Sequence, residues 1–280
     1  MYSLVSQKEI LSSLYKISFS FLENYEEINI YSLKKALKQY YITSCNADVY
    51  SENFEVDILT QGDKLKNIIN LFELENSEIT IIEDTNLSLN KEKIIKALET
   101  IKTLSISPLF YLVIDTIALT NNIKSAGSAT SIKSIGVIWI QIEKHWTEFD
   151  IVEALIHEFT HTLLNLDEIV NVHYKNEKQI SNMKTWVPSA IRKELRPVPG
   201  VVHSIIVSME ILLLRKNLKY QQVTLHGPSE KLLMQTIKAL EALKETKESF
   251  ELLTQRTQEL LTLSEKKLLN YSKEMSGINE

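Results

Sequence analysis

The segment His157-Glu158-Phe159-Thr160-His161 holds the residues best suited to chemistry in this sequence. On a helix, residues four apart lie on one face, so the two imidazoles can bind one metal ion. Glu158 lies beside them and can serve as a general base or orient a ligand. The spacing therefore predicts a two-histidine metal site with Glu158 as its catalytic residue. The alternative is a non-catalytic helical binding protein in which both histidines are structural.

A third metal ligand must come from elsewhere in the chain. Metzincin-type proteases continue with a Gly and a further His, but Leu164 and Asp167 occupy those positions here. We therefore expect the helix to run past Leu164 and Asp167 to point away from the metal. Two candidates on a later helix are His203, which would give three imidazoles, and Glu210, which would give the ligand set of thermolysin-like zinc hydrolases. We favour His203, because it follows a Pro-Gly connector. The remaining histidines lie in polar contexts and are predicted to be surface residues: His145, His173 and His226.

The connector before His203, Arg196-Pro197-Val198-Pro199-Gly200, is rigid and interrupts any continuous helix. A guanidinium held there can bind a carboxylate through two parallel hydrogen bonds. Arg196 is therefore a candidate for binding an acidic cosubstrate, with Arg192 as the second choice. The alternative interpretation is a solvated basic loop.

The elements that position these residues are mainly helical, because Gly and Pro are scarce, with 6 and 5 residues in a chain of 280. Thr147 and Asp150 resemble a capping box at the start of the motif helix. Amphipathic patterns predict further helices over residues 3–22, 31–41, 62–73, 90–103, from Val201 to about Asn217 and between Ser229 and Ser276. Runs rich in Val, Ile and aromatic residues predict strands at 79–82 and within 110–119 and 134–144, the last two joined by a mobile loop over 121–133.

These elements predict an α+β fold, predominantly helical, with a small antiparallel sheet beside the HExxH helix. We expect a mainly helical N-terminal region over 1–105 and a metal-site region over 106–280, or one continuous domain. The strand over 134–144 precedes the motif helix, as in zincin-like peptidases that hold an extended substrate by main-chain hydrogen bonds. The sequence therefore favours a peptide substrate.

Composition excludes several other classes of protein. The formal net charge is −5, which gives no footprint for nucleic acid. Cys45 is the only cysteine, so neither an intramolecular disulfide nor a thiolate metal cage can form. The N-terminal residues lack the pattern of a secretion signal, and the longest apolar stretches are too short for a membrane span. We therefore expect a cytoplasmic protein without a membrane partner.

The motif helix and the later segment together resemble the HExxH-motif peptide-modification family found beside ribosomal peptide gene clusters. The resemblance covers roughly residues 150 to 215. Members carry HExxH followed by a W-x-x-x-x-R-x-x-x-R-P-x-x-G-x-x-H block, which this sequence matches approximately at Trp186, Arg192, Arg196, Pro197, Gly200 and His203. The family is understood as non-haem iron, α-ketoglutarate-dependent peptide β-hydroxylases.

The resemblance implies that His157, His161 and His203 bind Fe(II), and that Arg196 or Arg192 pairs with the distal carboxylate of α-ketoglutarate. Dioxygen would be consumed and a residue of a precursor peptide hydroxylated at its β-carbon. Glu158 would then orient a ligand or water from outside the first coordination shell. Three neutral imidazoles differ from the usual two-His-one-carboxylate set, which Glu158 or Glu210 would restore by coordinating.

The rival interpretation of the same residues is a zinc metallopeptidase. In it Glu158 takes the proton of a zinc-bound water, and either His203 or Glu210 completes the ligand set.

Overall fold

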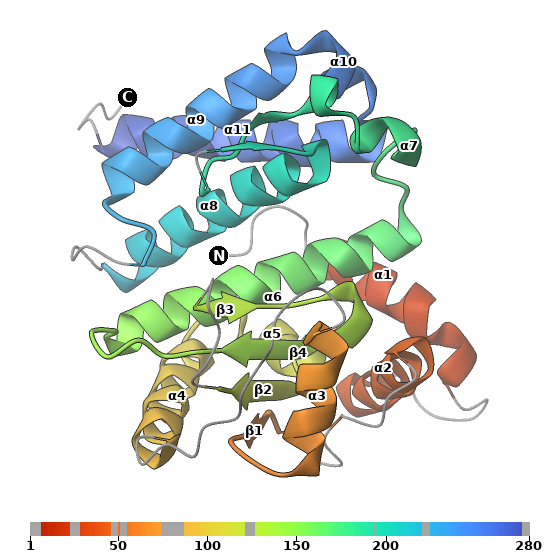
Figure 1. Ribbon diagram of the computed structural model, residues 1–280, viewed down its shortest axis with the longest axis vertical. Helices are drawn as coiled ribbons and strands as arrows, with labels where there is room; N and C mark the ends of the chain where they lie inside the picture. Colours follow the sequence, from red (N-terminus) through yellow and green to blue (C-terminus); the bar gives the residue numbers. More distant parts are fainter. Residues whose placement is uncertain are drawn as a thin grey trace. The chain divides into compact units, whose positions relative to one another are not determined.

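The computed structural model describes residues 7–22, 29–45, 50, 55–73, 87–120, 127–192, 194–219 and 225–275 (Figure 1). The chain divides into two compact units, Gln7–Asp167 and Glu168–Glu280. The boundary expected near residue 105 falls inside the first unit. The physical reason is that β1 (Asp57–Leu59), which precedes residue 105, pairs with β2 (Thr116–Leu119), which follows it.

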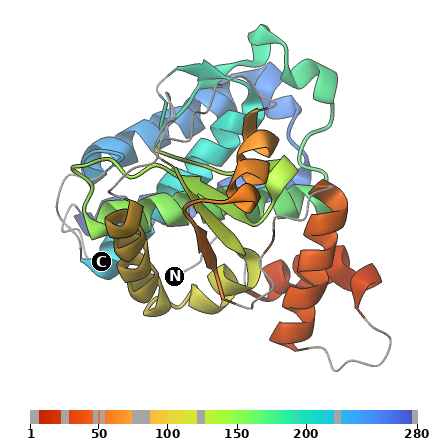
Figure 2. The ribbon, with the colours of Figure 1, turned by 60° about the horizontal axis from the view of Figure 1, so that its bottom comes forward.

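The first unit combines helices with a four-stranded sheet, and Figure 2 shows α3 (Asp63–Glu73) and α4 (Leu87–Lys102) on opposite sides of its strands. The predicted helices are present, although the strand predicted at 79–82 lies outside the described residues. The helices are α1 (Gln7–Ser18), η1 (Phe19–Phe21), α2 (Ile30–Cys45), α3 (Asp63–Glu73), α4 (Leu87–Lys102), α5 (Ser107–Val113), η2 (Ile132–Ser134) and most of α6 (Glu148–Val170).

The sheet has the strand order β1-β2-β4-β3, with β3 at Ser128–Ala129 and β4 at Val137–Ile140. The predicted α+β class with mainly helical content is confirmed. The expected antiparallel pairing holds for β3 with β4, whereas β1–β2 and β2–β4 are parallel. Parallel neighbours require a crossover connection of about a dozen residues or more. The segments that join β1 to β2 and β2 to β4 are long enough for this. Every residue of β2 and β4 is buried, so these two strands form the centre of the core.

Two sequence-based expectations fail in this region. The run 110–119 does not form one strand, because its first part belongs to α5 and β2 begins at Thr116. Pro108 lies in the first turn of α5, where its fixed φ suits a helix start, and a short apolar run has no periodicity that separates strand from buried helix. The connection 121–133, expected to be a loop, contains the short strand β3.

Helix α6 carries the HExxH motif and begins as the sequence predicts. The Thr147 backbone N–H donates to Asp150 Oδ2 over 2.8 Å, and the Asp150 N–H donates to Thr147 Oγ1 over 3.3 Å. This reciprocal capping satisfies two amides that the helix itself leaves unpaired. The helix continues past Leu164 to Val170, so Asp167 lies within it and the reversal typical of metzincins is absent from this helix. Phe159 packs against Phe110 of α5 with ring centroids 5.2 Å apart.

The second unit is helical apart from a two-stranded antiparallel ribbon. Its long buried helix α8 (Val198–Leu218) packs against α9 (Ser229–Glu245) and α11 (Gln255–Met275). α8 begins directly after Pro197, three residues before the predicted start at Val201. The segment between Ser229 and Ser276, predicted to be helical, forms three described helices. The other elements are α7 (Glu177–Ile180), η3 (Met183–Thr185), β5 (Val187–Pro188), β6 (Leu195–Arg196), α9 (Ser229–Glu245), α10 (Lys247–Glu251) and α11 (Gln255–Met275).

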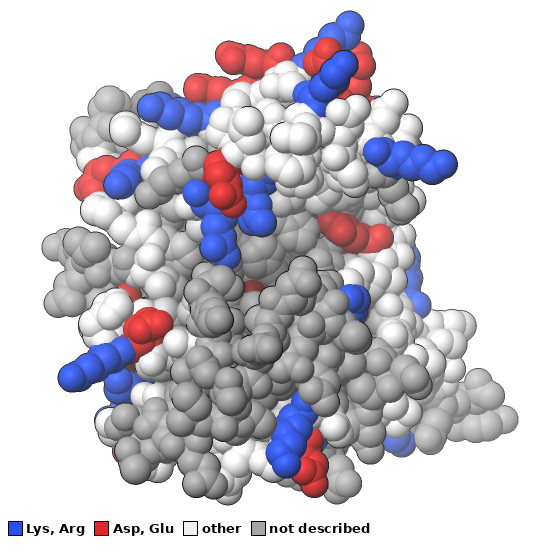
Figure 3. Space-filling model, viewed as in Figure 1, with Lys and Arg blue, Asp and Glu red and all other residues white. Residues whose placement is uncertain are grey.

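α8 is the one described helix long and apolar enough to cross a membrane, but 78% of its most apolar window is buried inside the protein. A core helix of a water-soluble domain has the same character. On the face drawn in Figure 3, basic and acidic side chains of the described residues are interspersed.

Candidate metal centre

His157 and His161 converge as their spacing predicts. Their Nε2 atoms lie 3.2 Å apart, and both residues are only partly accessible to solvent. Two imidazole nitrogens bound to one ion at roughly 2.0–2.1 Å would be roughly 3.3 Å apart in tetrahedral geometry and roughly 3.0 Å apart in octahedral geometry. The pair therefore fits a metal ion in either geometry. A hydrogen bond from one ring N–H to the other ring is also compatible with this distance.

Glu158 lies between the imidazole pair and the sheet. Its carboxylate is almost fully buried, at 4% exposure. Oε1 accepts a hydrogen bond from Ser128 Oγ over 2.8 Å and lies 3.8 Å from His157 Nε2. One carboxylate oxygen thus faces both a strand residue and a candidate metal ligand.

Strand β3 lies along α6 because the side chains of Ser128 in β3 and of Thr130, directly after it, match two positions on the helix. Ser128 contacts Glu158, and the Thr130 and Thr162 hydroxyls lie 3.2 Å apart. Two residues along a strand span roughly 6.6 Å and four along a helix span roughly 6 Å, so both contacts form together. Thr130 Oγ1 also donates to the Val137 carbonyl over 3.2 Å.

The start of β3 is fixed by Gly127. A Cβ atom at this position would lie 2.4 Å from the Trp146 ring, which packs directly on the Gly127 backbone. The Gly127 carbonyl accepts a hydrogen bond from the Gln141 N–H over 2.8 Å. Only glycine leaves room for the indole here, so this contact helps to set the position of β3 against α6.

The predicted peptide-holding strand needs a correction. Residues 134–144 supply β4, and β4 has β2 on one side and β3 on the other. Both of its edges are occupied, so it cannot receive a substrate strand. The edge strand next to the HExxH helix is β3, which the sequence did not reveal because it has only two residues.

His203, the predicted third ligand, belongs to the second unit and lies on α8. Its Nε2 is 3.0 Å from Glu168 Oε1, and the same oxygen lies 3.5 Å from His173 Nδ1. Two imidazoles therefore face one carboxylate. The carboxylate–imidazole contact is the arrangement that orients metal-binding histidines in many proteins.

His173 is buried, at 2% exposure, so its prediction as a surface residue is wrong. Its carbonyl accepts hydrogen bonds from the Thr254 N–H over 3.0 Å and from Thr257 Oγ1 over 2.7 Å. These bonds tie the chain after α6 to the start of α11. The sequence context of His173 is polar, but tertiary packing covers it.

The neighbouring His173 and His203 keep the Glu168 carboxyl ionised. Burial raises the pKa of its carboxyl, but the hydrogen bonds and charges of His173 and His203 outweigh burial and lower the pKa to about 2. Burial, followed by the negative charge of Glu168, raises the pKa of the neighbouring Tyr174 hydroxyl well above its usual range. Glu168 is thus a charged carboxylate that its surroundings stabilise.

Arg196 lies beside the first turn of α8. A Cβ atom built on Gly200 would lie 3.8–4.0 Å from the Arg196 side chain, so this side chain runs across Gly200. Gly200 and His203 are three residues apart on one helix, which places Arg196 and His203 on the same side of α8. The Arg196 Nε is 3.7 Å from Glu194 Oε1, and the side chain is 43% exposed. Arg192 is exposed.

Glu210, the alternative third ligand, is buried on α8 at 1% exposure. Burial lowers the pKa of Lys267 on α11, and the negative charge of Glu210 opposes this shift. The carboxylate therefore already has a nearby cation within its unit. His145 is exposed, as predicted, and His226 is half-buried.

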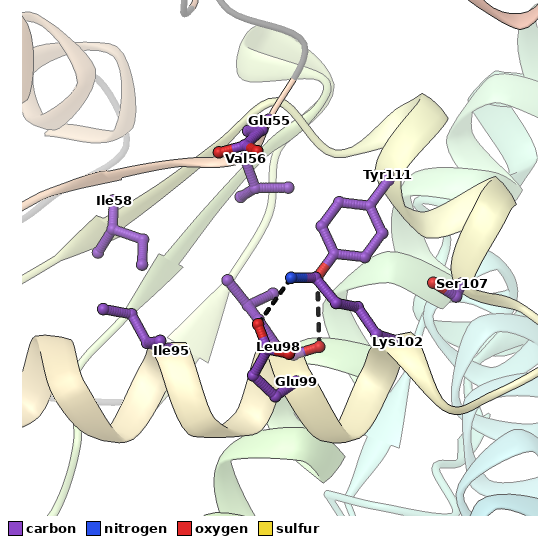
Figure 4. A pocket seen from close by; sticks show the side chains of 9 residues that line it. All are labelled: Glu55, Val56, Ile58, Ile95, Leu98, Glu99, Lys102, Ser107 and Tyr111. Carbon is purple, nitrogen blue, oxygen red and sulfur yellow. Dashed lines mark hydrogen bonds and ion pairs between the residues drawn. The ribbon is translucent and has the colours of Figure 1, made fainter.

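A separate hollow of about 400 Å³ lies in the first unit between β1 and α4 (Figure 4). Val56, Ile58, Ile95 and Leu98 form its apolar lining. At its rim Lys102 pairs with Glu99, and Tyr111 donates to the Leu98 carbonyl over 3.2 Å. This hollow contains none of the predicted site residues.

The structure brings His157, His161 and Glu158 together with Ser128, and separately brings His203 together with Glu168 and His173. Among the described residues, no three His, Cys, Asp or Glu side chains are already gathered as a metal site. No protein-family model matches the chain, and no curated protein matches it significantly. The interpretation of function therefore depends on the residues themselves.

Sequence reasoning missed three residues of these clusters. Glu168 lies seven residues after His161, and this helical period was the signal available for it. Ser128 and His173 gave no local signal, because their partners are distant in the sequence.

Proposed function

We propose that this protein is an Fe(II)- and α-ketoglutarate-dependent oxygenase that hydroxylates the β-carbon of a residue in a ribosomally synthesised peptide. The observation that carries the proposal is the convergence of the His157 and His161 Nε2 atoms at 3.2 Å, next to an edge strand. The imidazole pair supports a metal and the edge strand supports a peptide. The choice of iron depends on the resemblance of residues 186–203 to the peptide-modification family.

Each predicted residue has a defined task in this proposal. His157 and His161 bind the metal, with His203 as the third ligand, so three protein nitrogens leave positions for a cosubstrate and dioxygen. Arg196 binds the distal carboxylate of α-ketoglutarate, and its place on the His203 side of α8 supports this role. Glu158 orients a polar group beside the metal. The bound Fe(II) and α-ketoglutarate would activate dioxygen, which is the oxidant: one oxygen atom would convert a C–H bond of the peptide to C–OH, and the other would convert α-ketoglutarate to succinate and carbon dioxide.

The test is anaerobic addition of Fe(II) to metal-free protein, followed by α-ketoglutarate and a visible absorption spectrum. Bidentate α-ketoglutarate on Fe(II) gives a metal-to-ligand charge-transfer band, which we expect for the wild-type protein and not for His157→Ala. His145→Ala is the matched control, because it removes an exposed histidine. A His157→Ala protein that keeps the band would contradict the proposal.

A zinc peptidase is the second candidate, and the position of Glu158 favours it. Its buried carboxylate lies 3.8 Å from His157 Nε2 and is held against the edge strand. A general base that serves a metal-bound water must lie close to the metal and to the bound peptide. Tight zinc binding without the charge-transfer band, together with cleavage of a peptide library that Glu158→Gln abolishes, would establish this alternative.

A further inference from the structure

The main chain of Ser128 faces away from the sheet. The Gln141 N–H donates to the Gly127 carbonyl, and the Ile140 carbonyl accepts from Thr120 on the β2 side. In an antiparallel pair, successive residues turn their N–H and C=O groups alternately toward and away from the partner strand. Ser128 pairs with Ile140 in the register of β3 and β4. Gly127 and Ala129 therefore face β4, and the N–H and C=O of Ser128 face the open edge, the edge of the sheet beside which no further described strand lies.

The Ser128 side chain points toward the motif helix. Its hydroxyl donates to Glu158 Oε1 over 2.8 Å. The neighbouring contact of Thr130 with Thr162 and the packing of Trp146 on Gly127 hold the strand at this distance from α6. A single residue thus faces the open edge of the sheet with its main chain and the HExxH glutamate with its side chain.

We propose that Ser128 couples substrate docking to the metal centre: its N–H and C=O pair with the main chain of an extended peptide, while its hydroxyl positions Glu158. The proposal rests on the proposed function, which supplies the metal and the peptide. The occupant is an extended peptide segment, because the open edge is continuous with the metal centre through the Ser128–Glu158 hydrogen bond. Pairing would fix the Ser128 backbone and hence the direction from which its hydroxyl reaches Glu158.

Three variants separate the two halves of this role. Ser128→Ala removes the hydroxyl and keeps both main-chain groups. Ser128→Pro also removes the outward N–H, which β4 does not use, so the β3–β4 pairing is retained. Thr130→Ala is the matched control, because it removes a hydroxyl that contacts α6 directly after β3 without touching Glu158. Thermal unfolding of each variant checks that the fold is kept.

The docking half is tested with a fluorescein-labelled hexapeptide of sequence Thr-Val-Thr-Val-Thr-Lys, chosen because main-chain pairing tolerates varied side chains. Fluorescence anisotropy should give Ser128→Ala an affinity within about twofold of wild type, and Ser128→Pro an affinity about threefold to tenfold weaker than Ser128→Ala, as expected for one hydrogen bond. Protein is titrated to millimolar concentration, because two main-chain hydrogen bonds alone hold a peptide weakly. Equal affinities of these two variants, or no binding by the wild type at that concentration, would overturn docking on Ser128.

The coupling half is tested with Co(II), whose visible spectrum reports on groups around the metal. The hexapeptide should change the spectrum of the Co(II)-loaded wild type and of Thr130→Ala, and should leave that of Ser128→Ala unchanged. A response of Ser128→Ala equal to wild type would overturn the coupling. Co(II) uptake by His157→Ala equal to wild type would instead overturn the proposed metal centre and the coupling with it, while the anisotropy comparison judges docking independently.

Discussion

Each unit of this protein contains a cluster of two histidines and one glutamate, and the two clusters are arranged in opposite ways. In the first unit the imidazole nitrogens of His157 and His161 face each other, and Glu158 is turned toward Ser128. In the second unit the imidazoles of His173 and His203 both face Glu168. In the first arrangement two imidazole nitrogens converge on one point, where a metal ion could bind. In the second, the negative charge of Glu168 is paired with two imidazoles.

This difference shows why residue types alone do not identify a metal site. Histidines four apart on one helix are placed by the backbone, so their convergence needs no other element. The Glu168 cluster draws on α6, the chain after it and α8, and it lowers the pKa of its carboxyl without an added ion. We therefore expect the His157–His161 pair to bind a metal ion, and the Glu168 cluster to be stable without one.

The strongest test of this contrast is removal of a histidine from each cluster. His157→Ala and His161→Ala should weaken metal binding more than about 100-fold, because each removes a ligand and not a supporting contact. His173→Ala should leave metal affinity within about tenfold of wild type and lower the melting temperature. Competition with a chromophoric chelator measures the first effect and thermal unfolding the second. Equal metal affinities of His157→Ala and His173→Ala would remove the distinction.

His203 belongs to the Glu168 cluster and is also the predicted third metal ligand. If it is the third ligand, His203→Ala should weaken metal binding about 100-fold, measured with the same chelator. Because its Nε2 faces Glu168, we expect Nδ1 to bind the metal while the Nε2–H remains on the carboxylate. Full retention of metal by His203→Ala would leave Glu210 as the remaining predicted ligand.

Arg196 should affect the cosubstrate and not the metal. Arg196→Ala removes charge-assisted hydrogen bonds to a carboxylate, so we expect α-ketoglutarate binding to weaken about 10- to 100-fold. Arg192→Ala is the comparison, because Arg192 is the second candidate for this role; it is exposed, and its main-chain N–H, which donates to Ser189 Oγ, survives the substitution. Calorimetry on the metal-loaded protein without oxygen measures both affinities. Unchanged affinity in Arg196→Ala would remove this residue from the site.

The smallest expected effect is the acid sensitivity of the second cluster. The pKa of Glu168 falls from 4.5 to about 2 on folding, so its ionised form stabilises the protein fully above pH 4.5 and progressively less as the pH falls toward 2. Compared with Glu168→Gln, the wild type should lose about 2 kcal/mol more of its free energy of unfolding over this range. Urea unfolding at several pH values measures the difference. A gap between the two proteins that does not change with pH would contradict the assignment.

The features that could be predicted from sequence depend on local periodicity. The motif helix, its capping by Thr147 and Asp150 and its continuation past Leu164 are all confirmed. The α+β class follows from composition and a few β-branched runs. These features are set by neighbours within a few residues, which a single sequence contains.

The features that could not be predicted depend on tertiary contacts. β3 is too short to have a pattern, and its position depends on Trp146 packing on Gly127. His173 lies in a polar segment, yet bonds from Thr254 and Thr257 bury it. The parallel pairing of β1 with β2 joins segments on either side of residue 105, with three described helices between them, and such a long-range pairing has no local sequence signal.

The shortness of β3 limits how tightly a peptide can be held there. Ser128 offers only two outward main-chain groups, and hydrogen bonds of this kind contribute roughly 0.5–1.5 kcal/mol each. Their sum of about 1–3 kcal/mol is far below the roughly 8 kcal/mol that corresponds to micromolar affinity. Most of the binding free energy of a peptide must therefore come from contacts away from this strand. The protein would then select a peptide by parts of it that lie far from the residue that reacts. The peptide residues next to the reacting one could vary.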